Sequence, residues 1–195
     1  MGGKEGAYRD RYFSDNQAVR VAAKNRKGYR IIYQYVGLWK SWACEKGDLQ
    51  RLKLRIGVAE VADICLYLAC AAVDAPMNRV RMAGGIGILS VIPWILELSG
   101  VLRFLAAKEF VRELSLEEID RSIRCGCCLR AVLTILSGFC GMAGCLVSGD
   151  AGALDLFLLA GILSSGVLSL VVWRLYSKLL INTYRNVNGT PGSRI

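Results

Sequence analysis

Four long apolar blocks, separated by polar and charged segments, dominate the pattern of the chain. They cover residues 56–73, 82–105, 129–147 and 154–173, each about 18–24 residues long. A helix of roughly 20 residues, rising 1.5 Å per residue, crosses a hydrocarbon layer of about 30 Å. The pattern therefore predicts four transmembrane helices. A soluble helical bundle is the alternative, and four such blocks in succession argue against it, although Glu60 and Asp63 weaken the first block.

Positive charge is distributed unevenly among the segments that join the blocks. The links 74–81 and 148–155 are short, and of the 25 Lys and Arg residues only Arg79 and Arg81 lie in them. Positive residues that flank a span are retained in the cytoplasm. We therefore expect a multi-pass protein of the cell (plasma) membrane, with both termini and the 108–128 link cytoplasmic. Nucleic-acid binding is disfavoured, because this topology explains the basic charge without a ligand.

The charge pattern divides the chain into six segments. They are a mobile basic cytoplasmic arm (1–28), an amphipathic aromatic and basic juxtamembrane segment (29–55), transmembrane hairpin 1 (56–107), a cytoplasmic linker (108–128), transmembrane hairpin 2 (129–176) and a cytoplasmic tail (177–195). The predicted fold class is an all-α membrane protein, with four transmembrane helices as two tandem helical hairpins. In the linker, Ser115 and Glu118 have the spacing of a capping box, which predicts a short helix over about 116–124.

The two hairpins show signs of an internal repeat. A shift of 75 residues places Leu54-Arg55 on Leu129-Arg130, Cys65 on Cys140 and Cys70 on Cys145. Such an alignment indicates two hairpins of the same topology. Coincidence between apolar helices is the alternative interpretation.

Charged residues inside the apolar blocks are the main candidates for a site. Spacings of three and four put Glu60, Asp63 and Tyr67 on one face of the first helix. A lone charge in hydrocarbon costs on the order of 3 kcal/mol, so partners are expected. Arg–carboxylate pairs that fix helix register, or snorkelling, are the favoured interpretation, and a proton or cation site is the rival. The candidate intramembrane polar cluster is Glu60, Asp63, Tyr67, Glu97, Arg103, Arg130 and Arg174.

Aromatic residues are concentrated just before the first block. The stretch 29–42 fits an amphipathic helix, while alternate residues from Tyr29 to Tyr35 fit a strand, and the pattern leaves both open. A segment of this composition beside a span rests on the inner leaflet or docks a partner. The candidate membrane-surface or partner-docking residues are Tyr33, Tyr35, Trp39 and Trp42.

The cysteines and the absence of histidine restrict the chemistry. Weak metal candidates are Cys44, Cys125, Cys127 and Cys128, but the CGCC spacing fits a structural zinc site poorly, so neither metal nor cofactor is predicted. A chain without histidine has no Ser-His or Cys-His hydrolytic pair and no H-E-x-x-H zinc site. No catalytic residue is predicted, and we do not expect an enzyme.

Several short motifs carry a resemblance. They are the aromatic stretch before the first block, Pro76-Met77-Asn78, Arg103-Phe104 with Ala107-Lys108, and Glu118-Ile119-Asp120-Arg121. Over residues 29–182 the chain resembles uncharacterised four-span membrane proteins of Gram-positive gut bacteria. The resemblance implies a topology and no activity.

Two functions are compatible with these features. The first is a non-enzymatic accessory, scaffolding or regulatory membrane component, which would meet the lipid bilayer, a membrane or cytosolic protein partner, or a second copy of itself. The second is a small transporter or ion or proton pathway that uses the inner-leaflet carboxylates. The long basic N-terminal segment and the lack of a catalytic motif favour the first.

Overall fold

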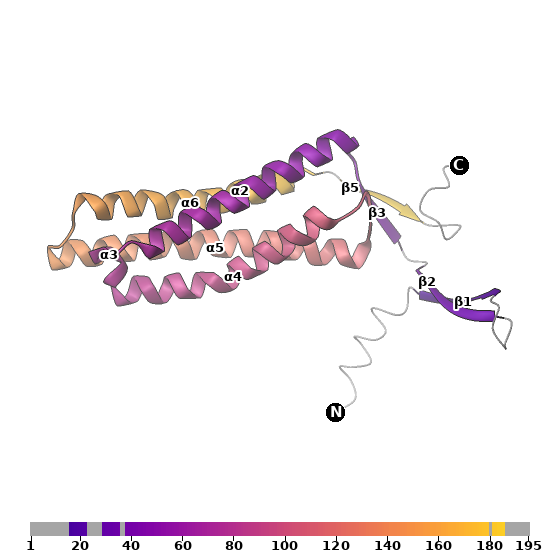
Figure 1. Ribbon diagram of the computed structural model, residues 1–195, viewed down its shortest axis with the longest axis horizontal. Coiled ribbons are helices and arrows are strands. Elements are labelled where there is room, and N and C mark those ends of the chain that lie inside the picture. Colours follow the sequence, from indigo (N-terminus) through magenta and orange to yellow (C-terminus); the bar gives the residue numbers. More distant parts are fainter. Residues whose placement is uncertain (1–15, 23–28, 36–37, 180, 186–195) are drawn as a thin grey trace, which may run out of the picture.

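The computed structural model describes residues 16–22, 29–35, 38–179 and 181–185. Four long helices form an elongated bundle (Figure 1): α2 (Lys46–Ala72), α4 (Arg81–Ala106), α5 (Glu113–Ser148) and α6 (Ala153–Ser177). A one-turn helix, α3 (Pro76–Arg79), lies in the α2–α4 connection. The short connections 73–80 and 149–152 share one end of the bundle, which we call the loop end. The opposite end, where strands lie, is the sheet end.

Three of the described helices are long and apolar enough to cross a membrane, namely α4, α5 and α6. This agrees with a multi-pass membrane protein. Helix α2 is also long, with 27 residues, but Glu60 and Asp63 lower its apolar character, and it is not among the three. At 36 residues, α5 is about 54 Å long. It therefore extends well beyond an apolar layer of about 30 Å.

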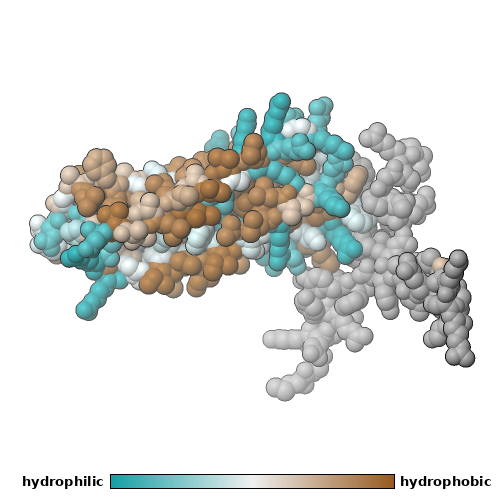
Figure 2. Space-filling model, in the orientation of Figure 1, coloured by the Kyte–Doolittle hydropathy of each residue, from teal (hydrophilic) through white to brown (hydrophobic). Residues whose placement is uncertain are grey.

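The outer surface of the bundle is apolar along its middle. Figure 2 shows hydrophobic side chains over the length of the helices and hydrophilic ones gathered toward both ends. A soluble bundle would bury such residues, because their exposure to water is unfavourable. Examples with more than half of their surface exposed are Ile88, Ile92, Val132, Phe139, Phe157 and Val167.

The helices do not pack as two equivalent hairpins. Helix α4 packs chiefly against α5, which also packs against α6, whereas α2 lies mainly on α6 and makes few contacts with α4. The proposed repeat pairs Arg55, which is exposed, with Arg130, which is buried. The two positions therefore have different environments, and the repeat stays a prediction.

The all-α prediction was wrong for the segments outside the apolar blocks, since the described residues include five strands. Strands β1 (Asn16–Ala22) and β2 (Tyr29–Tyr35) form an antiparallel pair. A second sheet has β3 (Leu38–Trp42) at its centre, between β4 (Phe110–Arg112) and β5 (Ile181–Arg185). Within 29–42, the described residues 29–35 and 38–42 are strands, not an amphipathic helix. β1 occupies part of the predicted mobile arm, whose residues 1–15 and 23–28 lie outside the described residues, as does 186–195 of the tail.

The predicted short helix of the linker is instead the start of α5. This helix begins at Glu113 and continues without a break to Ser148. Its N-cap residue is Arg112, with no side-chain capping bond, so Ser115 lies inside the helix and does not cap it. The apolar residues Leu116, Ile119 and Ile123 explain the continuity, because they are buried in the same core as Val101 and Phe104 of α4.

Aromatic packing closes the sheet end. Trp42, 7% exposed, meets the ring of Phe104 edge-on at 5.3 Å, and Phe104 meets Tyr176 in the same way at 5.4 Å. The indole Nε1 of Trp42 donates to the carbonyl of Lys108 at 3.2 Å. The prediction that Trp42 is a docking residue was therefore wrong, because its ring is buried inside the protein.

Lys53 ties α2 to the C-terminal end of α4. Its Nζ donates to the carbonyl oxygens of Leu105 at 3.1 Å and Ala107 at 2.5 Å. These carbonyls have no partner within their helix, and a cation at this end also suits the helix dipole. Partial burial lowers the pKa of Lys53 from its ordinary value.

Replacement of Trp42 tests how the sheet end is held. Trp42→Ala should lower the free energy of unfolding by about 3–5 kcal/mol, because it removes a buried ring and leaves a cavity. Trp173→Ala, at a position 36% exposed, is the control and should cost much less. Thermal unfolding in detergent measures both, and equal losses would mean that Trp42 does not support the bundle.

Candidate functional site

Arg130 lies at the centre of a buried group of charged side chains. It projects from α5 and is 2% exposed. One guanidinium nitrogen, Nη1, lies 2.6 Å from Oδ2 of Asp63 on α2 and 3.3 Å from Oε2 of Glu97 on α4. Both carboxylates are fully buried. The contact with Asp63 is an ion pair without hydrogen-bond geometry, while Glu97 also accepts a hydrogen bond from Nη1. A single side chain thus connects three helices.

Helix α6 contributes two hydroxyl groups to the same cluster. Ser165 donates to Oδ1 of Asp63. One turn later, the Oγ of Ser169 lies 2.8 Å and 2.9 Å from the two carboxylate oxygens of Glu97. The thiol of Cys127 on α5 donates to Glu97 Oε1 at 3.2 Å. Hydrogen bonds of this kind compensate carboxylates for the loss of water.

Glu60 differs from the other two acids. It is 2% exposed, and neither of its carboxylate oxygens has a hydrogen-bond partner among the described residues. Arg130 Nη2 and the hydroxyl of Thr134 are also buried without a hydrogen-bond partner in this part of the chain. Two carboxylates contact the guanidinium, and Glu60 interacts electrostatically with Arg130, Glu97 and Asp63. With three acids and one base, two negative charges are in excess when all three acids are ionised.

Two aromatic rings cover Arg130. Its Cζ lies 6.0 Å from the ring centroid of Tyr67 on α2 and 5.6 Å from that of Trp94 on α4. A guanidinium is attracted to an aromatic face at such distances. The hydroxyl of Tyr67 donates to the carbonyl of Gly87 at 3.0 Å and lies 3.2 Å from the Oγ of Ser90. Tyr67 thus bridges α2 and α4 beside the cluster.

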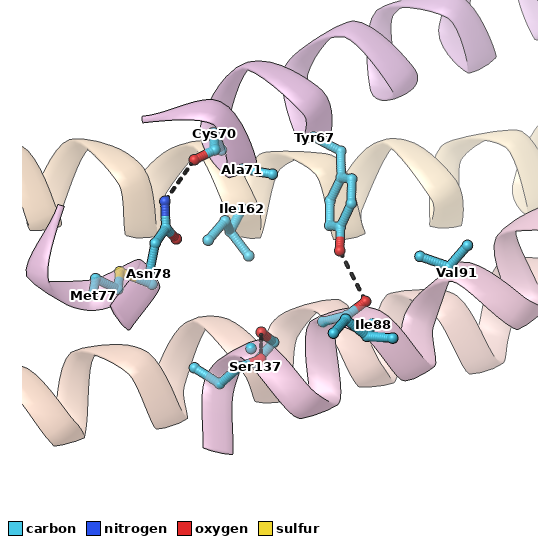
Figure 3. A pocket seen from close by; sticks show the side chains of 12 residues that line it. Tyr67, Cys70, Ala71, Met77, Asn78, Ile88, Val91, Ser137 and Ile162 are labelled. Atoms are coloured by element: carbon cyan, nitrogen blue, oxygen red, sulfur yellow. Dashed lines mark hydrogen bonds between the residues drawn. The ribbon is translucent and has the colours of Figure 1, made fainter. Parts of the chain in front are cut away.

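A cavity of about 220 Å³ lies on the loop-end side of Tyr67 (Figure 3). Its wall is formed by α2, α3 and α4, with Ser137 of α5 and Ile162 of α6. No charged residue lines it. Polar groups at its wall include Tyr67, Asn78 and Ser137, and Figure 3 shows the phenol of Tyr67 directed from α2 toward α4.

Five of the seven residues predicted for the polar cluster come together, namely Glu60, Asp63, Tyr67, Glu97 and Arg130. The other two do not, and those assignments were wrong. Arg103 is exposed and pairs with Glu118 at 2.8 Å. Arg174 is exposed on α6. Both side chains face away from the bundle interior. The position of an arginine near the end of an apolar block therefore did not show which arginine pairs with the buried acids.

Sequence reasoning missed four members of the site: Ser165, Ser169, Cys127 and Trp94. The serine pair had a signal, since two hydroxyl residues one turn apart in an apolar helix share a face. Cys127 was grouped with Cys125 and Cys128, which are exposed, whereas Cys127 is buried against Glu97.

The remaining predicted positions lie at the sheet end. Trp39 is half-buried in β3, and the side chains of Tyr33 and Tyr35 lie outside the described residues. Cys44 is exposed just before α2. Within the described ranges, no three His, Cys, Asp or Glu residues are arranged to hold a metal ion.

Comparisons with family models, with curated proteins and with solved structures found no match.

Removal of the guanidinium tests the cluster's contribution to stability. Arg130→Gln should lower the free energy of unfolding by about 3–5 kcal/mol, because it leaves buried carboxylates without their partner. The additional change Asp63→Asn should recover part of this loss, since it removes one of those charges. Thermal unfolding of the single and double variants in detergent gives the coupling between them.

Arg124→Gln is the matched control for Arg130→Gln. Arg124 pairs with Asp120 at 2.7 Å on the surface, and such exposed pairs within a helix contribute only about 0.3–0.5 kcal/mol. A loss at Arg130 no larger than that at Arg124 would show that the buried pair does not hold the helices together.

Proposed function

We propose that the chain is an integral membrane protein with four spans, in which α2 is the fourth, and that the sheet end and both termini are cytoplasmic. The exposed face of α2 supports this, because Leu54, Val58, Val61 and Leu68 are each more than half exposed. Its two acids are turned into the bundle. A helix that faced water would have the opposite arrangement. The positive-inside pattern of the sequence supports the orientation.

Single-cysteine chains test this topology. In a background without other cysteines, an impermeant maleimide applied to intact cells should label Asp74→Cys and leave Cys44 unlabelled until the membrane is permeabilised. Partial desolvation, together with the nearby Asp48 carboxylate, raises the pKa of the Cys44 thiol, so labelling is best carried out at mildly alkaline pH. Labelling of both positions from the same side would show that α2 does not cross the membrane.

We further propose that the buried cluster binds and releases protons, and that the protein is a proton pathway or a small proton-coupled transporter. The observation that carries this proposal is Glu60, a buried carboxylate without a hydrogen-bond partner beside a guanidinium that already pairs with two others. A structural ion pair needs one acid for one base. Each further ionised acid costs several kcal/mol in a nonpolar surrounding, so the excess acids are expected to hold protons.

The geometry also suggests how proton binding would change the bundle. Asp63, Glu97 and Glu60 all compete for Arg130. A proton on Asp63 weakens the contact that joins α2 to α5, and it frees the guanidinium for another carboxylate. Arg130 can therefore pair with one carboxylate or with another, and each pairing is a distinct arrangement of the cluster. Protonation of an acid shifts the balance between these arrangements.

A proton is favoured over a metal ion as the ligand. Na⁺ and larger cations need several oxygen ligands converging on one point. Asp63 and Glu97 instead direct oxygens toward Arg130, Ser165 and Ser169. This leaves Glu60 with free oxygens, and one carboxylate is sufficient for a proton.

Proton flux into reconstituted vesicles tests the proposal. Vesicles with a pH-sensitive dye inside should acidify after an imposed pH gradient when they contain the protein. Glu60→Gln, which keeps the side-chain shape and cannot release a proton, should reduce this flux to that of protein-free vesicles. Glu117→Gln makes the same change at an exposed position and should leave the flux unaltered.

The hypothesis of an accessory component without transport activity makes the opposite prediction. It expects no flux above that of empty vesicles in the parent protein, or the same flux in Glu60→Gln and Glu117→Gln. Either result would remove the proton-pathway proposal and leave a structural function for the cluster.

A further inference from the structure

The side of the bundle between α2 and α4 is open on the loop-end side of the cluster. These two helices make few contacts with each other, whereas the other neighbouring helices pack along much of their length. The cavity of about 220 Å³ lies in this space. It is large enough for several water molecules, and its polar wall groups can bind them.

The lining of the cavity suits water and not a bound ion. Tyr67, Asn78 and Ser137 bring neutral polar side chains to it, and the remaining lining residues are apolar or small. The amide nitrogen of Asn78 donates to the carbonyls of Cys70 and Val73, at 2.9 Å and 2.7 Å. Because no charged residue lines the cavity, it has no counter-charge for a metal cation or an anion.

The cavity ends at the cluster. Tyr67 is both a lining residue and a neighbour of Arg130, whose Cζ lies 6.0 Å from its ring. Asp63 lies one turn from Tyr67 on the same face of α2. The hydroxyl of Tyr67 reaches across to α4 (Figure 3). Tyr67 thus belongs both to the wall of the cavity and to the surroundings of Arg130.

The opposite direction is closed by the aromatic and aliphatic core. Ile56 lies one turn from Glu60 toward the sheet end, and Val101 lies one turn from Glu97. Both are fully buried with Phe104, Ile123 and Val172 in one apolar cluster. Among the described residues, this cluster lies between the acids and the sheet end. A proton that reaches the acids in this conformation therefore has its shortest polar route through the cavity.

We propose that the cavity between α2 and α4 is the aqueous entrance through which protons reach Asp63, Glu97 and Glu60 from the loop-end side of the membrane. This inference rests on the proposed proton pathway. It adds the route and the side of entry. Protons move along water in the cavity and past Tyr67 to a carboxylate, so that only O–H bonds form and break.

Two adjacent glycines allow a matched test. A Cβ at Gly84 or at Gly85 would meet no atom within 4 Å, so both positions accept a larger residue. Gly84 lines the cavity, whereas Gly85 does not. A phenylalanine at position 84 is expected to fill the cavity, and one at position 85 faces outward. The two variants change the same residue type at neighbouring positions of the same helix.

Cys70 reports on water in the cavity without the need for transport. It lines the cavity, and a chain in which six cysteines are serine, with Cys70 and the fully buried Cys127 kept, retains it as the accessible thiol. A small water-soluble methanethiosulfonate should modify Cys70 in vesicles. Gly84→Phe should slow this modification by about tenfold or more, because the reaction needs access to the thiolate from water. Gly85→Phe should leave the rate unaltered.

The same variants are then measured for proton flux. Gly84→Phe should reduce the flux to that of protein-free vesicles, and Gly85→Phe should not change it. If thermal unfolding shows that Gly84→Phe impairs folding, Gly84→Leu replaces it. Leucine is smaller than phenylalanine and should also reduce the proton flux.

The outcomes separate this inference from the proposed function. Cys70 that does not react, or that reacts equally in Gly84→Phe and Gly85→Phe, would show that the cavity does not hold water in contact with the solvent. Protection of Cys70 with unaltered flux would show that protons enter elsewhere, while the proton pathway stands. Absence of flux in the parent protein would overturn the pathway, and the entrance with it.

Discussion

The contact of Arg130 with Asp63 and Glu97 is the interaction on which the arrangement of the helices depends. These side chains come from α5, α2 and α4, and Ser165 and Ser169 add α6 through hydrogen bonds to the same acids. Helices in lipid gain little from apolar contact with each other, since lipid tails are equally apolar. A buried charged cluster is different, because the bundle interior offers its members few other polar partners. It therefore fixes the depth and rotation of all four helices relative to one another.

The cluster also explains why α2 differs from its neighbours. Its acids are turned into the bundle, so it can be less apolar than the other three helices and still present leucine and valine outward. It leans on α6 and away from α4. The cavity and the bridging hydroxyl of Tyr67 lie in the space between α2 and α4. Other contacts close the two ends of the bundle. Trp42 and Lys53 make hydrogen bonds at the sheet end. At the loop end, the carboxylate of Asp155 accepts hydrogen bonds from the backbone nitrogens of Met77 and Gly152.

The apolar blocks predicted two of the long helices, α4 and α6, to within a few residues at both ends, because the length and composition of a span are local properties. The blocks 82–105 and 154–173 became helices of residues 81–106 and 153–177. The inward direction of Glu60 and Asp63 was also predictable from their spacing. The sequence did not show that Arg130, and not Arg103 or Arg174, lies with these acids. The helices carry apolar residues both on their outer surface and toward the core. Without a polar face, the sequence does not show how each helix is rotated.

The three-stranded sheet escaped prediction for a different reason. Trp39 pairs with Arg112 on one side and with Tyr184 on the other. These partners lie far apart in the sequence, and β4 has only three residues. No local pattern records such a pairing. The aromatic alternation from Tyr29 to Tyr35 did favour a strand, but an amphipathic helix fitted the same residues, and only the partner strand decides between them.

The central claim is that the cluster contains more acids than Arg130 can neutralise, and that the excess acids are protonated. Infrared spectroscopy of the protein in bilayers at neutral pH tests it most directly, because a protonated carboxylic acid has a carbonyl band that a carboxylate lacks. We predict such a band in the parent protein and in Glu117→Gln, and its weakening or loss in Glu60→Gln. A spectrum without a protonated carboxyl band, or a band unaltered by Glu60→Gln, would contradict the account.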